Sequence, residues 1–321
     1  MTTLSFDPGD DGGRSGGSGR LSRDLSPRPR RLTDVDARGR RRRRTDRAVS
    51  LVLTVVTAVA VVPLVLILFK VGQEGYGVLN LTFFTQDQMP FSRAGGGARN
   101  GLVGTFLIIG AAIAMAIPVG IGAAVYLVEY GGGKLGAAVR FFTDVMTGVP
   151  SIFVGLFIYA FLVIGTARLG FSTLAGAIAI AIMMLPIVVR ASEEMLRMVP
   201  ESMRNASAGV GARRWQTATR VVLPAAAPGL ATGSMLAVAR GAGETAPLIL
   251  TGLGSLTLTL TLVGERQSSL PQLIHQHAVQ PFTPGLERAW GGALCLVAIT
   301  LLITVSARFV AARFAGKREG L

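Results

Sequence analysis

Long apolar segments recur along the chain, separated by shorter stretches that carry most of the charges. The first, Ala48 to Phe69, holds 22 residues without a charged side chain. A helix needs about 20 apolar residues to cross roughly 30 Å of hydrocarbon, so this segment is long enough to span a membrane. Five further runs follow at about 102–128, 145–165, 173–189, 225–250 and 289–307. The pattern predicts six transmembrane helices.

These runs indicate an all-α polytopic membrane protein with a polar extension at each end. We expect a first transmembrane helix over 48–70, an extracytoplasmic loop over 71–100, a transmembrane domain of five helices over 101–312 and a cytoplasmic tail over 313–321. Residues 1–47 are rich in Gly, Ser, Arg and Asp. Such a segment cannot bury enough apolar area to offset the entropy of ordering, so we predict a disordered, Arg-rich cytoplasmic tail.

Charge then orients the chain. The formal net charge is +14, although only 16% of the residues are charged. Residues 1–47 hold 13 of the 32 Lys and Arg; with this tail inside, the inner segments hold 25 and the outer segments 6. This bias predicts a multi-pass protein of the cytoplasmic membrane with both termini in the cytoplasm. The run Arg40–Arg44 precedes the first apolar segment and is interpreted as an anchor attracted to anionic lipid. The alternative, a membrane-anchored protein that binds nucleic acid through this tail, is not favoured.

Residue types needed for several kinds of chemistry are scarce. The lone Cys295 excludes a disulfide framework and a zinc finger. The two histidines, His275 and His277, are too few for a histidine-based metal site. The sequence contains no G-x-x-x-x-G-K-[ST] loop for ATP and no H-E-x-x-H metalloprotease box. We therefore expect neither an enzyme nor a bound metal or cofactor.

The segment 190–224, between the fourth and fifth apolar runs, carries the most specific signal. It is longer than the 2–8 residues that commonly connect helices in a bundle. Pro200 suits the first turn of a new helix, and Gly211 allows a sharp turn. Arg213 and Trp215 form part of a basic and aromatic cluster that is able to dock on a protein. The residues alone leave open an amphipathic helix at the membrane interface or a protein-binding element.

A spaced motif in this loop resembles the EAA loop of ABC-importer permeases. That family has Glu-Ala-Ala, three residues, Gly, nine residues, an aliphatic residue, any residue and then Leu-Pro. The matching positions here are Asn205, Ala206, Ser207, Gly211, Val221, Leu223 and Pro224. Asn205 replaces the family Glu, and Ser207 replaces the second Ala. The resemblance implies a helix over 200–215 that couples the chain to a partner ATPase, with Arg213 and Trp215 in the same surface.

Other segments resemble the phosphate-importer permease of the PstA type. They are Gly101–Thr105, Ala124–Tyr130, Gly148–Phe157, Leu185–Ile187, Gly243–Pro247 and Ser269–Pro271. The resemblance covers roughly 70–315 and implies the type I ABC-importer permease fold. It further implies translocation of inorganic phosphate by alternating access, powered by ATP and Mg²⁺ bound in the partner subunits. The implied partners are a second, homologous permease, two ABC ATPase subunits and an extracytoplasmic phosphate-binding protein. Transport of another oxyanion or small solute is the alternative.

Arg240 and Glu244 are charges within the fifth apolar run. Arg240 lies about 22 Å beyond Ala225 at a rise of ~1.5 Å per residue, where a charge costs about 2.5–3.5 kcal/mol. Glu244 follows four residues later, so the two can pair on one helix face. The pair either packs two spans together or lines a path for an anion, because a guanidinium matches phosphate oxygens bidentately. The resemblance implies that both matter for transport, and we place Thr245 in the same path.

Overall fold

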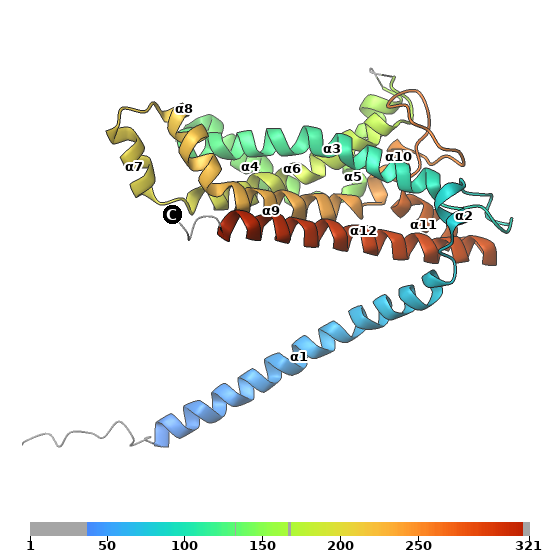
Figure 1. Cartoon of the computed structure of the whole chain (residues 1–321), viewed down its shortest axis with the longest axis horizontal. Helices are drawn as coiled ribbons and strands as arrows, with labels where there is room; N and C mark the ends of the chain where they lie inside the picture. The colour runs from blue at the N-terminus through green and yellow to red at the C-terminus, as the bar shows by residue number, and fades with distance from the viewer. Residues whose placement is uncertain (1–36, 132, 166–167, 317–321) are drawn as a thin grey trace, which may run out of the picture. The chain divides into compact units, whose positions relative to one another are not determined.

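The computed structural model describes residues 37–131, 133–165 and 168–316. It divides into two compact units, Met1–Val62 and Pro63–Leu321. Helix α1 (Ala37–Tyr76) crosses the boundary between them, and the elements from α2 onward belong to the second unit (Figure 1). Residues 1–36 of the predicted tail lie outside the described residues.

Helix α1 begins earlier than the sequence pattern predicts. The tail was expected to stay disordered up to residue 47, but residues 37–47 are helical, including the run Arg40–Arg44. Arginine has a high helix propensity. Extending an existing long helix also adds one hydrogen bond per residue without a new nucleation step. The apolar segment therefore propagates its helix back into the basic run.

The six predicted apolar runs fall on six candidate spans. Five helical segments within the described residues are long and apolar enough to cross a membrane: Thr45–Tyr76, Arg99–Tyr130, Thr173–Arg197, Arg214–Ala242 and Thr283–Ser306. The sixth candidate is a bent pair, Lys134–Gly148 and Ser151–Val163. The predicted all-α architecture is confirmed, with five candidate spans among the described residues, or six if the bent pair forms one broken span.

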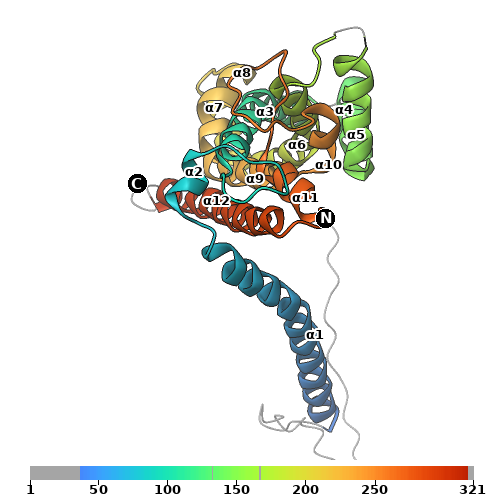
Figure 2. The same ribbon diagram turned by 90° about the vertical axis from the view of Figure 1, so that its right-hand side faces the viewer.

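The break lies between α4 (Lys134–Gly148) and α5 (Ser151–Ile158), whose extension η2 is a π-helical turn (Tyr159–Val163). The two halves are bent by 108°. Val149 has φ −75° and ψ 124° because the ring of Pro150 disfavours the helical conformation in the preceding residue. The apolar run predicted over 145–165 contains this break, which hydropathy does not indicate because the segments on both sides of it are apolar. Figure 2 shows α4 and α5 at one edge of the bundle.

Four long helices lie side by side in the second unit (Figure 1). They are α3 (Arg99–Val125), α6 (Thr173–Arg197), α9 (Leu223–Ala242) and α12 (Thr283–Gly316). Ile108, Ile180 and Val238 are among the buried residues that fill the space between the first three. A Cβ at Gly120 would approach Val188 to 2.6 Å, so α3 and α6 are in backbone-close contact. Small residues allow such close packing, which supplies much of the attraction between helices in lipid.

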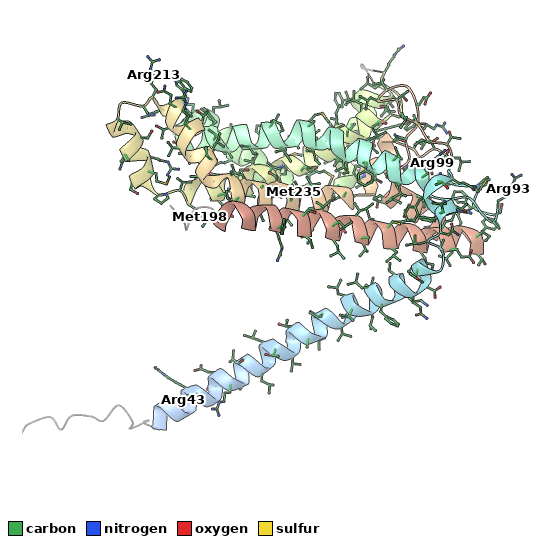
Figure 3. All side chains as sticks on the ribbon, in the orientation of Figure 1. Arg43, Arg93, Arg99, Met198, Arg213 and Met235 are labelled. Carbon is green, nitrogen blue, oxygen red and sulfur yellow. The ribbon has the colours of Figure 1, made fainter. Side chains whose placement is uncertain are left out.

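Short elements close the two ends of the bundle. One end carries α7 (Glu201–Gly209), α8 (Arg214–Thr217) and the π-helical turn η3 (Ala218–Val222). The other carries α2 (Leu81–Thr85), α10 (Ala246–Thr251) and α11 (Leu270–Ala278). We call these the α7 end and the α11 end. Figure 3 places Arg213 and Met198 at the α7 end, and Arg93 and Arg99 at the α11 end.

Three predicted boundaries differ from the observed ones. The segment 190–224 is largely helical, because α6 continues to Arg197 and the next span begins at Arg214. The predicted helix over 200–215 is shorter, since α7 ends at Gly209 and a turn separates it from α8. Helix α12 continues to Gly316, beyond the expected boundary at 312, and residues 317–321 lie outside the described residues.

Candidate translocation and coupling sites

Arg240 lies in the last turn of α9, and Glu244 follows in the segment that joins α9 to α10. Helix α9 ends at Ala242 with Gly243 as its cap, so the predicted common helix face does not exist. The two side chains still pair, with Nε of Arg240 3.9 Å from Oε1 of Glu244. Thr245 is the N-terminal cap residue of α10 and is half-buried. The structure thus brings all three predicted residues together, at a helix break rather than inside a helix.

The Arg240 guanidinium keeps its hydrogen-bonding capacity. Its side chain is 68% exposed, while that of Glu244 is 19% exposed. A separation of 3.9 Å is too long for a hydrogen bond. Within the described part of the chain, the guanidinium donates no hydrogen bond, so its planar set of donors is available to a ligand.

Arg240 also lines a small cavity of about 70 Å³ at the break between α4 and α5. The other lining residues are Met146, Thr147, Val149, Val154, Met183, Pro186 and Ile187. Helix α5 in turn packs against the segment after Glu244, because a Cβ at Gly155 would lie 2.6 Å from Cα of Pro247. Two helix breaks and the exposed arginine therefore share one place in the bundle. The sequence pointed to Arg240 but gave no signal that the α4–α5 break lies beside it.

The EAA-like motif spreads over α7, the following turn and the start of α9. Asn205 and Ala206 are exposed on α7. The hydroxyl oxygens of Ser207 and Thr217 lie 2.9 Å apart, which joins α7 to α8. Gly211 has φ +82° and makes the turn after α7. Leu223 is the first residue of α9 and Pro224 follows in its first turn.

The basic and aromatic cluster beside this motif is on the surface. Arg213 is exposed and caps α8, with its backbone N–H donating to Oε1 of Gln216 at 2.7 Å. Trp215 is 51% exposed. Apolar side chains of Met198, Met203 and Val210 are also exposed at the α7 end. The α7 end therefore carries an apolar and basic surface of the kind that a partner protein would cover.

Sequence reasoning missed two clusters of ion pairs near the α7 end. Glu193 is 4% exposed and lies within 4 Å of three arginines: Arg140 at 3.1 Å, Arg197 at 2.6 Å and Arg190 at 3.8 Å. Arg190 also pairs with Asp144. The second cluster joins Arg204 of α7 to Glu129 at 3.1 Å. The only sequence signal for either was the position of these charges at the borders of apolar runs.

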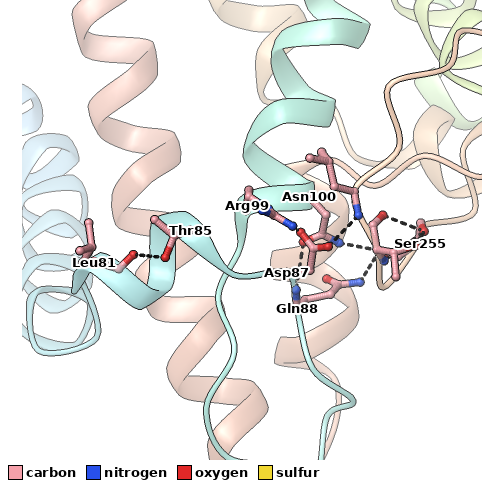
Figure 4. A network of polar contacts seen from close by, with 9 residues as sticks. Leu81, Thr85, Asp87, Gln88, Arg99, Asn100 and Ser255 are labelled. Carbon is pink, nitrogen blue, oxygen red and sulfur yellow. Dashed lines mark hydrogen bonds and ion pairs between the residues drawn. The ribbon is translucent and has the colours of Figure 1, made fainter.

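A polar network joins two loops and the start of α3 at the α11 end (Figure 4). Asp87 accepts hydrogen bonds from Nε of Arg99 and from the backbone N–H of Leu258, each at 2.9 Å. The carbonyl oxygen of Ser255 accepts from the amide groups of Gln88 and Asn100 at 2.7 and 2.6 Å. The hydrogen bond from Arg99 lowers the pKa of Asp87, and the one from Leu258 adds to this, while burial opposes both. The segment 256–262, in which Leu alternates with Thr, is an irregular loop that these contacts hold in place.

Buried Arg288 and His277 stabilise the same end. The Arg288 guanidinium donates to the backbone carbonyls of Met89, Pro90, Arg93 and Gly95. His277 is fully buried. Its ring packs edge-to-face against that of Phe91, with 4.8 Å between the ring centroids. Burial, together with the nearby charge of Arg288, lowers the pKa of His277 to about 4. The histidine is therefore neutral near pH 7.

A family model matches the part of the chain that contains these sites. The family described as "Binding-protein-dependent transport system inner membrane component" matches residues 116–318. The chain belongs to this family. Its membership agrees with the resemblance that the motif around Gly211 indicated, and the match includes both Arg240 and α7.

Within this family, the chain is similar to curated relatives named PstA. It is 42% identical over 223 residues to the phosphate transport system permease protein PstA 1 of Mycobacterium tuberculosis, covering 68% of this chain and 72% of the relative. It is 38% identical over 243 residues to PstA of Haemophilus influenzae, covering 75% of this chain and 85% of the relative. PstA of Yersinia pestis is 38% identical over 251 residues, covering 78% of this chain and 84% of the relative. The predicted PstA-type resemblance is confirmed.

A solved structure supports the fold. The inward-facing MetNI methionine ABC transporter contains a chain that superposes on this permease with a TM-score of 0.55 at 18% identity, covering 67% of this chain and 94% of that chain. At this identity the likeness concerns the fold. The predicted type I ABC-importer permease fold is confirmed, and the chain is an integral membrane permease subunit.

Proposed function

We propose that this permease translocates inorganic phosphate as one subunit of an ATP-driven importer. The single observation that carries the proposal is the Arg240 guanidinium, exposed and without a hydrogen bond among the described residues, beside the α4–α5 break. A planar guanidinium binds phosphate oxygens bidentately and stays charged at physiological pH. The PstA names of the relatives at 36–42% identity supply the substrate class.

Glu244 and Thr245 complete the path in this proposal. A carboxylate 3.9 Å from the guanidinium limits how tightly the site holds an anion, because it repels the same charge that Arg240 attracts. The Thr245 hydroxyl is a neutral donor at the start of α10. Weak, reversible binding suits a transporter, which has to release its substrate on the other side.

Helix α7 and the surface around Trp215 are proposed to bind a partner ATPase. The supporting observations are the EAA-like spacing and the exposed apolar residues Met198, Met203 and Val210. The importer would contain a second, homologous permease, two ABC ATPase subunits that bind ATP and Mg²⁺, and an extracytoplasmic phosphate-binding protein. This chain would bind no cofactor of its own. The α7 end and both termini would face the cytoplasm, as the distribution of Lys and Arg favours.

Transport would follow alternating access. ATP binding closes the ATPase pair and moves α7 as a rigid body, and the bundle then opens its path toward the binding protein. Phosphate enters and pairs with Arg240. ATP hydrolysis restores the inward-facing state, from which phosphate leaves to the cytoplasm.

Uptake of radiolabelled phosphate tests the substrate and the role of Arg240. A strain that lacks its own phosphate importers is complemented with the full set of subunits, carrying wild-type, Arg240→Lys or Arg240→Gln permease. Removing a charge-assisted hydrogen-bonding group costs about 1.5–3 kcal/mol, so Arg240→Gln is expected to lower uptake about 10- to 100-fold while assembly survives. Arg240→Lys keeps the charge but loses the planar pair of donors. Its uptake should therefore lie between that of the wild type and that of Arg240→Gln.

Lys70→Gln is the matched control, because it removes one positive charge from an exposed i,i+4 pair near the end of α1. It should leave uptake unchanged. Loss of complex assembly in Arg240→Gln would instead assign the Arg240–Glu244 pair to helix packing. Failure of the wild-type complex to transport phosphate, with uptake of another oxyanion or small solute, would favour the alternative substrate class.

A further inference from the structure

We propose that Arg204 is a positioning residue that transmits the movement of α7 to helices α3 and α6. The proposal rests on the proposed role of α7 as the ATPase-binding helix and extends it to the step inside the permease. Arg204 directly precedes the EAA-like motif, and its ion pair with Glu129 is not part of that motif.

Helix α7 has few other means of moving the bundle. None of its residues, Glu201–Gly209, is buried, so no hydrophobic core fixes it to the neighbouring helices. The backbone connections at its two ends are short turns, over residues 198–200 before it and through Gly211 after it. Hydrogen bonds and ion pairs of its side chains must therefore carry much of any force. Among the described residues these side-chain contacts come from Arg204 and Ser207.

Arg204 connects three elements through one rigid group. Its Nε donates to Oε1 of Glu129 at 3.1 Å, in the π-helical turn η1 (Tyr126–Tyr130) that continues α3. Its terminal nitrogens donate to the carbonyl oxygen of Leu196 at 2.8 Å and to that of Val199 at 2.5 Å. The Leu196 carbonyl lies in the last turn of α6 and that of Val199 in the turn directly after it. The last carbonyls of a helix lack partners within the helix, so a side-chain donor is readily accepted there. The planar guanidinium thus fixes α7 to the ends of α3 and α6 at the same time.

The surroundings make this contact stronger than an ordinary surface ion pair. The side chains of Arg204 and Glu129 are only 20% and 11% exposed. An exposed pair contributes about 0–1 kcal/mol, whereas screening by water is reduced for partly buried charges. Ser207 makes the other link, to Thr217 of α8, which leads into α9. Arg204 therefore serves the α3–α6 side of the bundle, and Ser207 serves the α9 side.

The test measures the number of ATP molecules hydrolysed per phosphate transported by the complete importer in proteoliposomes. Variants are Arg204→Gln, Arg204→Lys and Glu129→Gln. Allosteric coupling between two sites typically amounts to a factor of about 5–150, so Arg204→Gln should raise the ATP-to-phosphate ratio at least about fivefold. The ATPase subunits should stay bound and retain their ATPase activity. Arg204→Lys keeps the pair with Glu129, and Glu129→Gln keeps the carbonyl contacts, so both should give intermediate ratios.

Arg197→Gln is the control, since Arg197 is an exposed arginine on the neighbouring helix that pairs with Glu193 and not with α7. Its ATP-to-phosphate ratio should match the wild type. A wild-type ratio in Arg204→Gln, with transport intact, would overturn the proposal. If Arg204→Gln releases the ATPase subunits, Arg204→Lys and Glu129→Gln decide, because a purely structural role predicts an unchanged ratio in both. A wild-type complex that does not transport phosphate would count against the proposed function itself.

Discussion

Gly211 offers a test of the proposed ATPase-binding role of α7, because a substitution there acts through the backbone conformation. It lies at φ +82°, and a Cβ built on it would meet no atom within 4 Å. Its N–H donates to the carbonyl of Ala208 at 2.9 Å, and that of Ala212 donates to Ser207 at 3.2 Å, so the turn closes the C-terminal end of α7. Glycine is the usual residue in such a left-handed helix ending.

Gly211→Ala adds a methyl group to open space and changes only the cost of this conformation. An alanine in the left-handed region costs about 1–2 kcal/mol. Such a difference shifts the population of the turn by a factor of about 5–30. We therefore expect Gly211→Ala to raise the number of ATP molecules hydrolysed per phosphate transported by several-fold, without loss of the permease from the membrane. Gly211→Asn should have a weaker effect, because asparagine tolerates the left-handed region better than alanine does.

Gly264→Ala is the matched control for backbone strain. Gly264 has φ +88° and equally open space, but lies in the loop at the α11 end. The Gly264→Ala substitution imposes the same left-handed backbone cost at a site remote from α7. The ATP-to-phosphate ratio of this variant should therefore equal that of the wild type. Equal ATP-to-phosphate ratios in Gly211→Ala and Gly264→Ala would refute the reasoning. If both ratios rose, the effect would reflect general destabilisation, and if neither rose, there would be no effect of the turn on coupling.

Two further predictions concern stability, measured as thermal unfolding of the purified permease in detergent. Glu193→Gln should lower the unfolding temperature, because removing one partner of a buried ion pair costs about 3–5 kcal/mol; exposed Glu194→Gln should leave it unchanged. His277 has an ordinary pKa of 6.5 when unfolded and about 4 when folded. The unfolded chain therefore binds more protons between these values, and stability should fall as the pH drops from about 6.5 to about 4. His277→Leu should remove this part of the pH dependence; an unchanged slope would contradict the assignment.

Local sequence features specified much of the fold. Each long apolar run became a span because a helix satisfies its own backbone hydrogen bonds in lipid. Pro200, whose ring fixes φ, directly precedes α7, and Gly211, which has no Cβ, takes a left-handed conformation. The EAA-like and PstA-like motifs are enough to identify the family without any tertiary contact. Hydropathy failed at the helix breaks before Pro150 and after Ala242, where both flanking segments are apolar.

The candidate sites depended more on tertiary structure. The sequence by itself determined that Arg240 is a charge inside an apolar run, and therefore unusual. Only the tertiary structure decided that α9 ends two residues later, that the α4–α5 break lies beside the guanidinium, and that Arg204 reaches Glu129 across 75 positions of the chain. Composition and periodicity indicate whether a segment faces lipid, water or the interior of the protein. The partner of a charge is set instead by how helices pack, which depends on side-chain volumes contributed from distant parts of the sequence.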